Sequence, residues 1–164
     1  MERSKKIILV SHCILNQNSV VYPLARAQGA YKDIIIELMN NDVGIHQLPC
    51  PEYKYLGLKR EPMTKEQYDN ENFRNINKSI AVETVNIIKE YIKNGYEVLG
   101  IIGINESPTC SINRTKGILM EEIIYILNKE NIQLKYIDVP TDYSDGEQSK
   151  TFIEELHKLI SFLY

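Results

Sequence analysis

The sequence contains no tryptophan and only three cysteines, at positions 13, 50 and 110. An odd number of widely separated cysteines does not fit the disulfide framework of a small secreted domain. No apolar run approaches the length that crosses a membrane, and the charged start MERSKK leads into a strand-like run rather than a signal segment. We therefore expect a cytoplasmic protein with reduced thiols and no membrane partner.

An excess of positive charge is also missing. Lysine and arginine total 19 against 22 aspartate and glutamate residues, which gives a net charge of −3. Nucleic-acid-binding domains usually carry a basic excess, so we expect no nucleic-acid partner. The length of 164 residues and the 43% hydrophobic content fit a single domain, residues 1–164, with a buried core. The sequence does not indicate the oligomeric state.

Apolar runs and helical periodicity alternate along the chain. Short apolar runs predict strands at 5–11, 43–49, 96–105 and 133–139. Amphipathic spacing predicts helices at 30–42, 72–95, 116–132 and 145–164. Residues 12–28 and 50–70 are expected to be long loops. This order predicts an α/β fold: a single-domain doubly wound (Rossmann-like) parallel sheet of about four strands, with helices on both faces.

Each cysteine follows a predicted strand by a few residues. In LPCPEYK, residues 48–54, prolines on both sides of Cys50 exclude it from the middle of a strand or helix. Cys13 in ILVSHCILN and Cys110 in NESPTCS are placed similarly. Because the carboxyl ends of parallel strands share one edge, where such sheets bind ligands, the sequence predicts that the three thiols converge there.

Three thiols fit several kinds of site. A catalytic metal centre keeps one coordination position open, whereas a structural zinc site is closed by four ligands, here with His12, His46 or His157 as the candidate fourth. Iron–sulfur clusters also take thiolate ligands, and three of them leave one iron free for a substrate atom. A cysteine hydrolase would need a histidine base beside one thiol, and His12, adjacent to Cys13, is poorly placed for that.

Three segments, ILVSHCILN, LPCPE and ESPTC, together resemble the 2-thiouracil desulfurase family. The family's CLLG is similar to CILN, its CPE is unchanged at 50–52, and its SPSCG is similar to SPTCS at 107–111. Its later Pro–Arg element resembles KREP at 59–62. The resemblance covers most of the chain. It implies a [4Fe–4S] cluster bound by Cys13, Cys50 and Cys110 with one open iron site.

The resemblance also implies an enzyme, a desulfidase that removes sulfur from a small thiolated compound, such as a thiouracil-like base, without net redox change. The open iron would bind the substrate sulfur, and Glu52 would activate the attacking water. Ser107 would orient water or substrate. Asn16, Arg60 and Glu106 would line the substrate pocket, although a Lys–Arg pair such as 59–60 is ordinarily exposed.

The chain departs from the family pattern close to the expected ligands. The glycines that follow CLL and the last cysteine are replaced by Asn16 and Ser111, which narrow the backbone freedom there. These changes indicate a divergent branch that acts on another thiolated metabolite. The alternatives are a non-catalytic iron–sulfur sensor or sulfide carrier, which would not need Glu52, and a structural zinc-binding domain.

Overall fold

A computed structural model of the chain describes residues 1–161, which fold around one four-stranded sheet. The strands are β1 (Lys6–Val10), β2 (Gly44–Gln47), β3 (Glu97–Ile104) and β4 (Lys135–Val139). Their order is β2-β1-β3-β4, and every neighbouring pair is parallel. The predicted α/β class, the strand number and the parallel sheet are confirmed.

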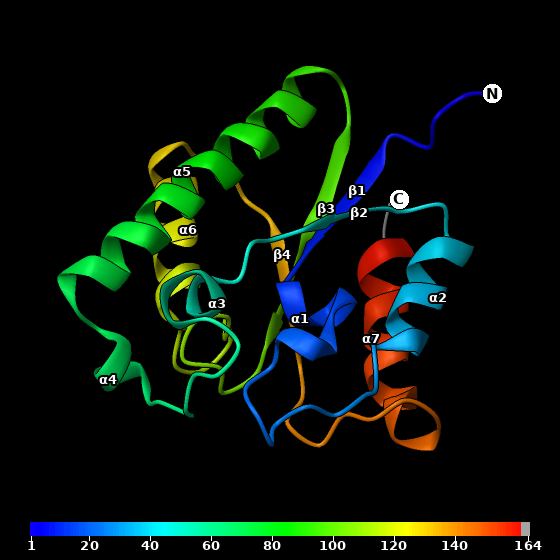
Figure 1. Ribbon diagram of the computed structural model, residues 1–164. Helices are drawn as coiled ribbons and strands as arrows, with labels where there is room; N and C mark the ends of the chain where they lie inside the picture. The colour runs from blue at the N-terminus through cyan, green and yellow to red at the C-terminus, as the bar shows by residue number, and fades with distance from the viewer. Residues whose placement is uncertain (162–164) are drawn as a thin grey trace.

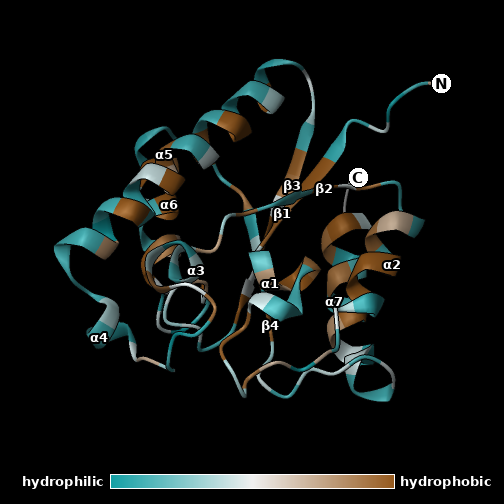
Figure 2. Cartoon of the chain, in the orientation of Figure 1, coloured by the Kyte–Doolittle hydropathy of each residue, from teal (hydrophilic) through white to brown (hydrophobic). Residues whose placement is uncertain are grey.

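Helices cover both faces of the sheet, as expected (Figure 1). The helices α5 (Glu71–Lys93) and α6 (Ile118–Lys129) lie on one side, and α2 (Lys32–Asn40) and α7 (Lys150–Ser161) lie on the other. In Figure 2, β1 and β3 are mostly hydrophobic, whereas the helices carry alternating bands of hydrophobic and hydrophilic residues. A sheet covered on both faces needs such continuous apolar strands, which explains why β1 and β3 read as unbroken runs.

The four long predicted helices and all four strands are present with shifted ends. The helix predicted at 145–164 is preceded by a short 3₁₀ turn, η2 (Glu147–Ser149), and its last residues, 162–164, lie outside the described part of the chain. No helix within residues 1–161 is long and apolar enough to span a membrane.

The two predicted long loops are wrong in part, because each contains short helices. Residues 12–28 hold α1 (His12–Leu15) and the 3₁₀ turn η1 (Gln17–Ser19), and residues 50–70 hold α3 (Pro51–Leu56) and α4 (Lys65–Tyr68). Local capping explains the second pair. Pro51 occupies the first turn of α3, where its missing N–H costs nothing, and Thr64 and Gln67 form a capping box on α4.

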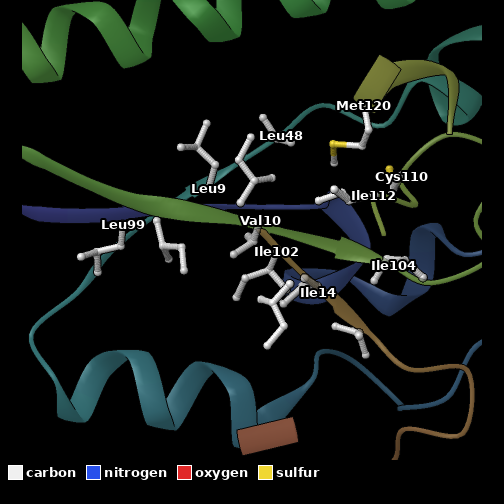
Figure 3. Close-up of a cluster of buried hydrophobic side chains, with 14 of the residues drawn as sticks. Leu9, Val10, Ile14, Leu48, Leu99, Ile102, Ile104, Cys110, Ile112 and Met120 are labelled. Atoms are coloured by element: carbon white, nitrogen blue, oxygen red, sulfur yellow. The ribbon is translucent and has the colours of Figure 1, made fainter. Parts of the chain in front are cut away.

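The core cluster reaches the carboxyl edge of the sheet. Figure 3 shows Cys110 beside Ile112 and Met120 at one end of this cluster, with Ile14 and Ile104 nearby. The chain runs from β1 outward to β2, and then returns to place β3 on the other side of β1. This reversal is a topological switch point, where ligands of doubly wound sheets bind.

Candidate functional site

One cavity of about 510 Å³ opens at the carboxyl edge of the sheet, and all three cysteines line it. Cys13 follows β1, Cys50 follows β2 and Cys110 follows β3, so three adjacent strands each deliver one thiol. All three are free cysteines; Cys110 is buried, and the other two are partly exposed. The predicted convergence of the thiols is confirmed.

The chain holds Cys50 and Cys110 through local hydrogen bonds. Cys50 is the residue before α3, and its Sγ accepts from the backbone N–H of Tyr53 at 3.4 Å. Cys110 donates its N–H to Ser107 Oγ at 3.0 Å, and its carbonyl accepts from Ile104 N at 3.0 Å. These bonds fix the side chain of Cys50 and the backbone of Cys110 at the rim of the cavity.

Asp138, in β4, anchors the loop that carries Cys110. Its buried carboxylate accepts from Ile112 N at 3.0 Å and from Asn113 N at 2.8 Å. The close approach needs Gly103 in β3, because a Cβ there would lie 2.4 Å from both Asp138 Oδ1 and the Cys110 carbonyl oxygen. The fourth strand therefore supplies no thiol but positions the third one.

Substitution of Asp138 with alanine is expected to lower the free energy of unfolding by about 1–3 kcal/mol, because one buried and one partly buried backbone N–H lose their acceptor. Chemical denaturation of the wild-type and variant proteins measures this difference. The matched control is Asp142→Ala, which removes an exposed carboxylate from the loop after β4 and should change stability by less than about 0.5 kcal/mol. Equal effects of the two substitutions would contradict the anchoring role.

The thiols share a site in which negative charge is costly. Burial, followed by the neighbouring Cys50 and Glu52, raises the pKa of Cys13 to about 12. Burial and the other two sulfurs likewise raise the pKa of Cys110, and burial raises that of Cys50. Three thiolates at this place need a cationic group between them, and the cavity is larger than a single ion requires. Three thiols are the kind of donor set that iron–sulfur clusters take, although within residues 1–161 they form no site for a single metal ion.

Glu52 lines the same cavity and is almost fully buried. Its Oε1 accepts from the Tyr68 hydroxyl at 3.0 Å, and its Oε2 accepts from Thr109 Oγ1 at 2.6 Å. Burial, and then the Glu52 carboxylate, raise the pKa of Tyr68, so the phenol remains a proton donor in this pair. Two hydroxyl groups therefore fix the carboxylate beside the thiols.

Arg60 is not the exposed half of a surface Lys–Arg pair. Its side chain is buried in the cavity wall, with Nε 3.5 Å from Glu52 Oε1. The guanidinium also donates to the Gly57 carbonyl at 3.0 Å and to the Ser19 carbonyl at 2.8 Å. Arg60 thus ties α3 to η1 and neutralises the charge of Glu52.

Of the other three residues expected in the pocket, two line the cavity and one does not. Ser107 lines the cavity, although its Oγ already accepts from the N–H groups of Thr109 and Cys110. Glu106 also lines it, with an exposed carboxylate and a positive φ of 62°. Asn16 does not line this cavity. Its side chain accepts from Asn18 N at 3.1 Å, and it faces a smaller neighbouring pocket.

The histidines that were weighed as zinc ligands or as a base have other surroundings. His12 lines the cavity, but its Nδ1 donates to the Leu48 carbonyl at 3.2 Å. His46 lies within β2, and the exposed His157 contacts Glu37 at 2.6 Å. Within residues 1–161, no group of three or more His, Cys, Asp and Glu side chains is placed to hold a metal ion.

Sequence reasoning missed four residues that shape the site: Arg26, Tyr68, Thr109 and Asp138. Thr109 stands inside the SPTC segment and could have been singled out, because a hydroxyl next to a ligand is a natural hydrogen-bond donor. Tyr68 and Asp138 carry no such local signal, because their roles depend on how α4 and β4 pack against the loops after β2 and β3.

Comparison with known proteins identifies the family of the chain. The family model described as "Putative 2-thiouracil desulfurase" matches residues 5–152. The uncharacterized protein MJ0003 of Methanocaldococcus jannaschii is 43% identical over 158 residues, which cover 96% of this chain and 99% of that protein. No solved structure shows significant similarity to the chain. The match over most of the chain places it plainly: the protein belongs to the putative 2-thiouracil desulfurase family.

Proposed function

We propose that this protein removes sulfur from a small thiocarbonyl compound of the 2-thiouracil type by hydrolysis, with a [4Fe–4S] cluster as cofactor. The reaction exchanges C=S and water for C=O and hydrogen sulfide, so no electrons are gained or lost. The observation that carries the proposal is the convergence of three thiols and one buried carboxylate in a single cavity. Membership of a family described as desulfurases supports the same reaction class.

Cys13, Cys50 and Cys110 would hold the cluster as thiolates. When bound, the cluster supplies a Lewis acid that polarises the C=S bond through its sulfur. Three protein ligands would leave one iron of the cluster without a protein donor. Because the thiol pKa values are raised, the cysteines are protonated before the cluster binds, and binding would release their protons. The cationic iron would then stabilise the resulting thiolates.

The remaining residues handle water and protons. Glu52 takes the proton of the attacking water as general base, and the hydroxyls of Tyr68 and Thr109 hold its carboxylate in place. Arg60 neutralises that carboxylate in the resting site. Apolar groups, including Val21, lower the local polarity and strengthen these interactions.

The test begins with protein purified without oxygen and analysed for iron and acid-labile sulfide. We expect a brown protein with one cluster per chain that releases sulfide from 2-thiouracil and forms uracil. A brown protein that releases no sulfide from any thiolated base would favour the sensor or sulfide-carrier alternative. A colourless protein that contains stoichiometric zinc would contradict both the desulfidase and the sensor or carrier, and would indicate a structural zinc-binding domain.

Substitution of Tyr68 with phenylalanine is expected to lower the rate of sulfide release about tenfold, because the Glu52 carboxylate loses one of its two hydroxyl donors. Iron content should not change, since the cysteines are untouched. The control is Tyr55→Phe: Tyr55 packs on Phe73 in the same aromatic cluster, and its hydroxyl is not one of the two that donate to Glu52. A full rate in Tyr68→Phe would contradict the positioning role.

A further inference from the structure

Arg26 presents a cation on the cavity wall that no carboxylate of residues 1–161 pairs with. It lies in the segment before α2 and lines the same cavity as the thiols. Its guanidinium donates to the Pro140 carbonyl and lies 5.8 Å from the centre of the Tyr31 ring. The Pro140 carbonyl uses one of the five guanidinium N–H donors, and the other four are available to a ligand.

The other ionisable groups of the cavity are already accounted for. Arg60 and Glu52 form their own ion pair. Glu106 is exposed, so water screens its carboxylate. The Pro140 carbonyl and the Tyr31 ring offset part of the cost of desolvating the half-buried Arg26 guanidinium, and an anionic partner would offset more of it.

The position of Arg26 relative to the sheet indicates how far a ligand must reach from the thiols to the guanidinium. Cys50, Cys13 and Cys110 follow β2, β1 and β3, whereas Pro140, which holds the guanidinium, directly follows β4. Adjacent strands are about 4.8 Å apart, so the carboxyl end of β4 lies about 5–10 Å from those of β3 and β1. One heterocyclic ring with a carboxylate opposite its thiocarbonyl spans such a distance.

From this placement we infer that the substrate is an anionic thiocarbonyl compound: its sulfur faces the three thiols, and its carboxylate binds Arg26. This inference rests on the proposed function and narrows it from thiolated bases in general to acidic ones. A neutral ring such as 2-thiouracil would give the guanidinium no charged partner beyond the neighbouring thiolates. Acidic substrates should therefore have a higher kcat/KM than neutral ones, because they gain one charge-assisted hydrogen-bonded contact with Arg26.

Three probes test the substrate class: 2-thiouracil and its 5-carboxylate and 6-carboxylate, each assayed for sulfide release by the cluster-loaded protein. We expect at least one carboxylate to exceed 2-thiouracil about tenfold in kcat/KM, mainly through a lower KM. In Arg26→Gln, this ratio should fall to about one. The matched control, Arg114→Gln, removes an exposed arginine outside the cavity and should leave the ratio as in the wild type.

A binding measurement separates this inference from the reaction itself. Calorimetry compares uracil, uracil-5-carboxylate and uracil-6-carboxylate, the corresponding products, on the loaded wild-type and Arg26→Gln proteins. Tighter binding of a carboxylate that depends on Arg26 supports the inference even if no sulfide is released, an outcome that refutes only the proposed reaction. Equal binding of all three, or a carboxylate preference that survives in Arg26→Gln, overturns it and leaves Arg26 as a counter-charge for the cluster.

Discussion

Serine in place of Cys110 is expected to reduce bound iron to background and to abolish sulfide release. The Cys110 thiol is buried between the core and the cavity, and a serine hydroxyl is a poor ligand for iron in place of a thiolate. Two remaining thiolates cannot hold a cluster that needs three. Iron analysis and the visible absorbance of protein prepared without oxygen measure the loss, and Cys13→Ser and Cys50→Ser should behave alike.

The matched control lies one residue away. Ser111 is buried, and its Oγ has no hydrogen-bond partner within the described residues, so Ser111→Ala removes a hydroxyl that makes no bond. Iron content and activity should stay at wild-type levels in that variant. If Cys110→Ser retained a full complement of iron, the cysteines would not be the ligands, and the proposed cofactor site would be wrong.

Glu52→Gln is expected to lower the rate of sulfide release by about 10²–10⁴-fold while leaving the iron content unchanged. The amide keeps the size of the side chain, and its single oxygen accepts from one of the two hydroxyls while its NH2 group donates to the other, but it cannot take a proton from water at neutral pH. The loss should therefore appear in kcat. Single-turnover sulfide release from preloaded protein measures the chemical step directly.

A neighbouring carboxylate serves as the control for Glu52. Glu61 is exposed, lies next to Arg60 in the sequence and does not line the cavity, so Glu61→Gln should release sulfide at the wild-type rate. Equal rates in wild type and Glu52→Gln would remove Glu52 from the reaction and leave a sensor or sulfide carrier as the better description of the protein.

The convergence of the thiols could be predicted because it depends only on topology. Once the apolar runs before Cys13, Cys50 and Cys110 are assigned to parallel strands, the carboxyl ends of those strands place the cysteines at one edge. The surroundings of Arg60 could not be predicted in this way. Its burial requires α3 and η1 to fold where the sequence indicates loops, and both are too short to leave a periodic pattern.

The hydroxyl groups around Glu52 show a similar limit. Thr109 is only one residue from Cys110, yet its bond to Glu52 joins the loop after β3 to the segment after β2. These segments are far apart in the sequence, so no local pattern predicts the contact. Tyr68 reaches the same carboxylate from α4, through an aromatic cluster with Phe73. Contacts of this kind depend on how separate segments pack together. The hydrophobic periodicity of one segment predicts its secondary structure but not this packing.

Because β1, β2 and β3 each contribute one sulfur, the order of biosynthesis matters under the proposed function. During synthesis, residues 13 and 50 leave the ribosome well before residue 110, so the nascent chain has no complete acceptor for iron. Delivery of the cofactor must wait until β1, β2 and β3 have paired and brought the three cysteines to one edge. A ligand that binds only the finished fold stabilises it by mass action, so loaded protein should resist proteases that degrade the empty form.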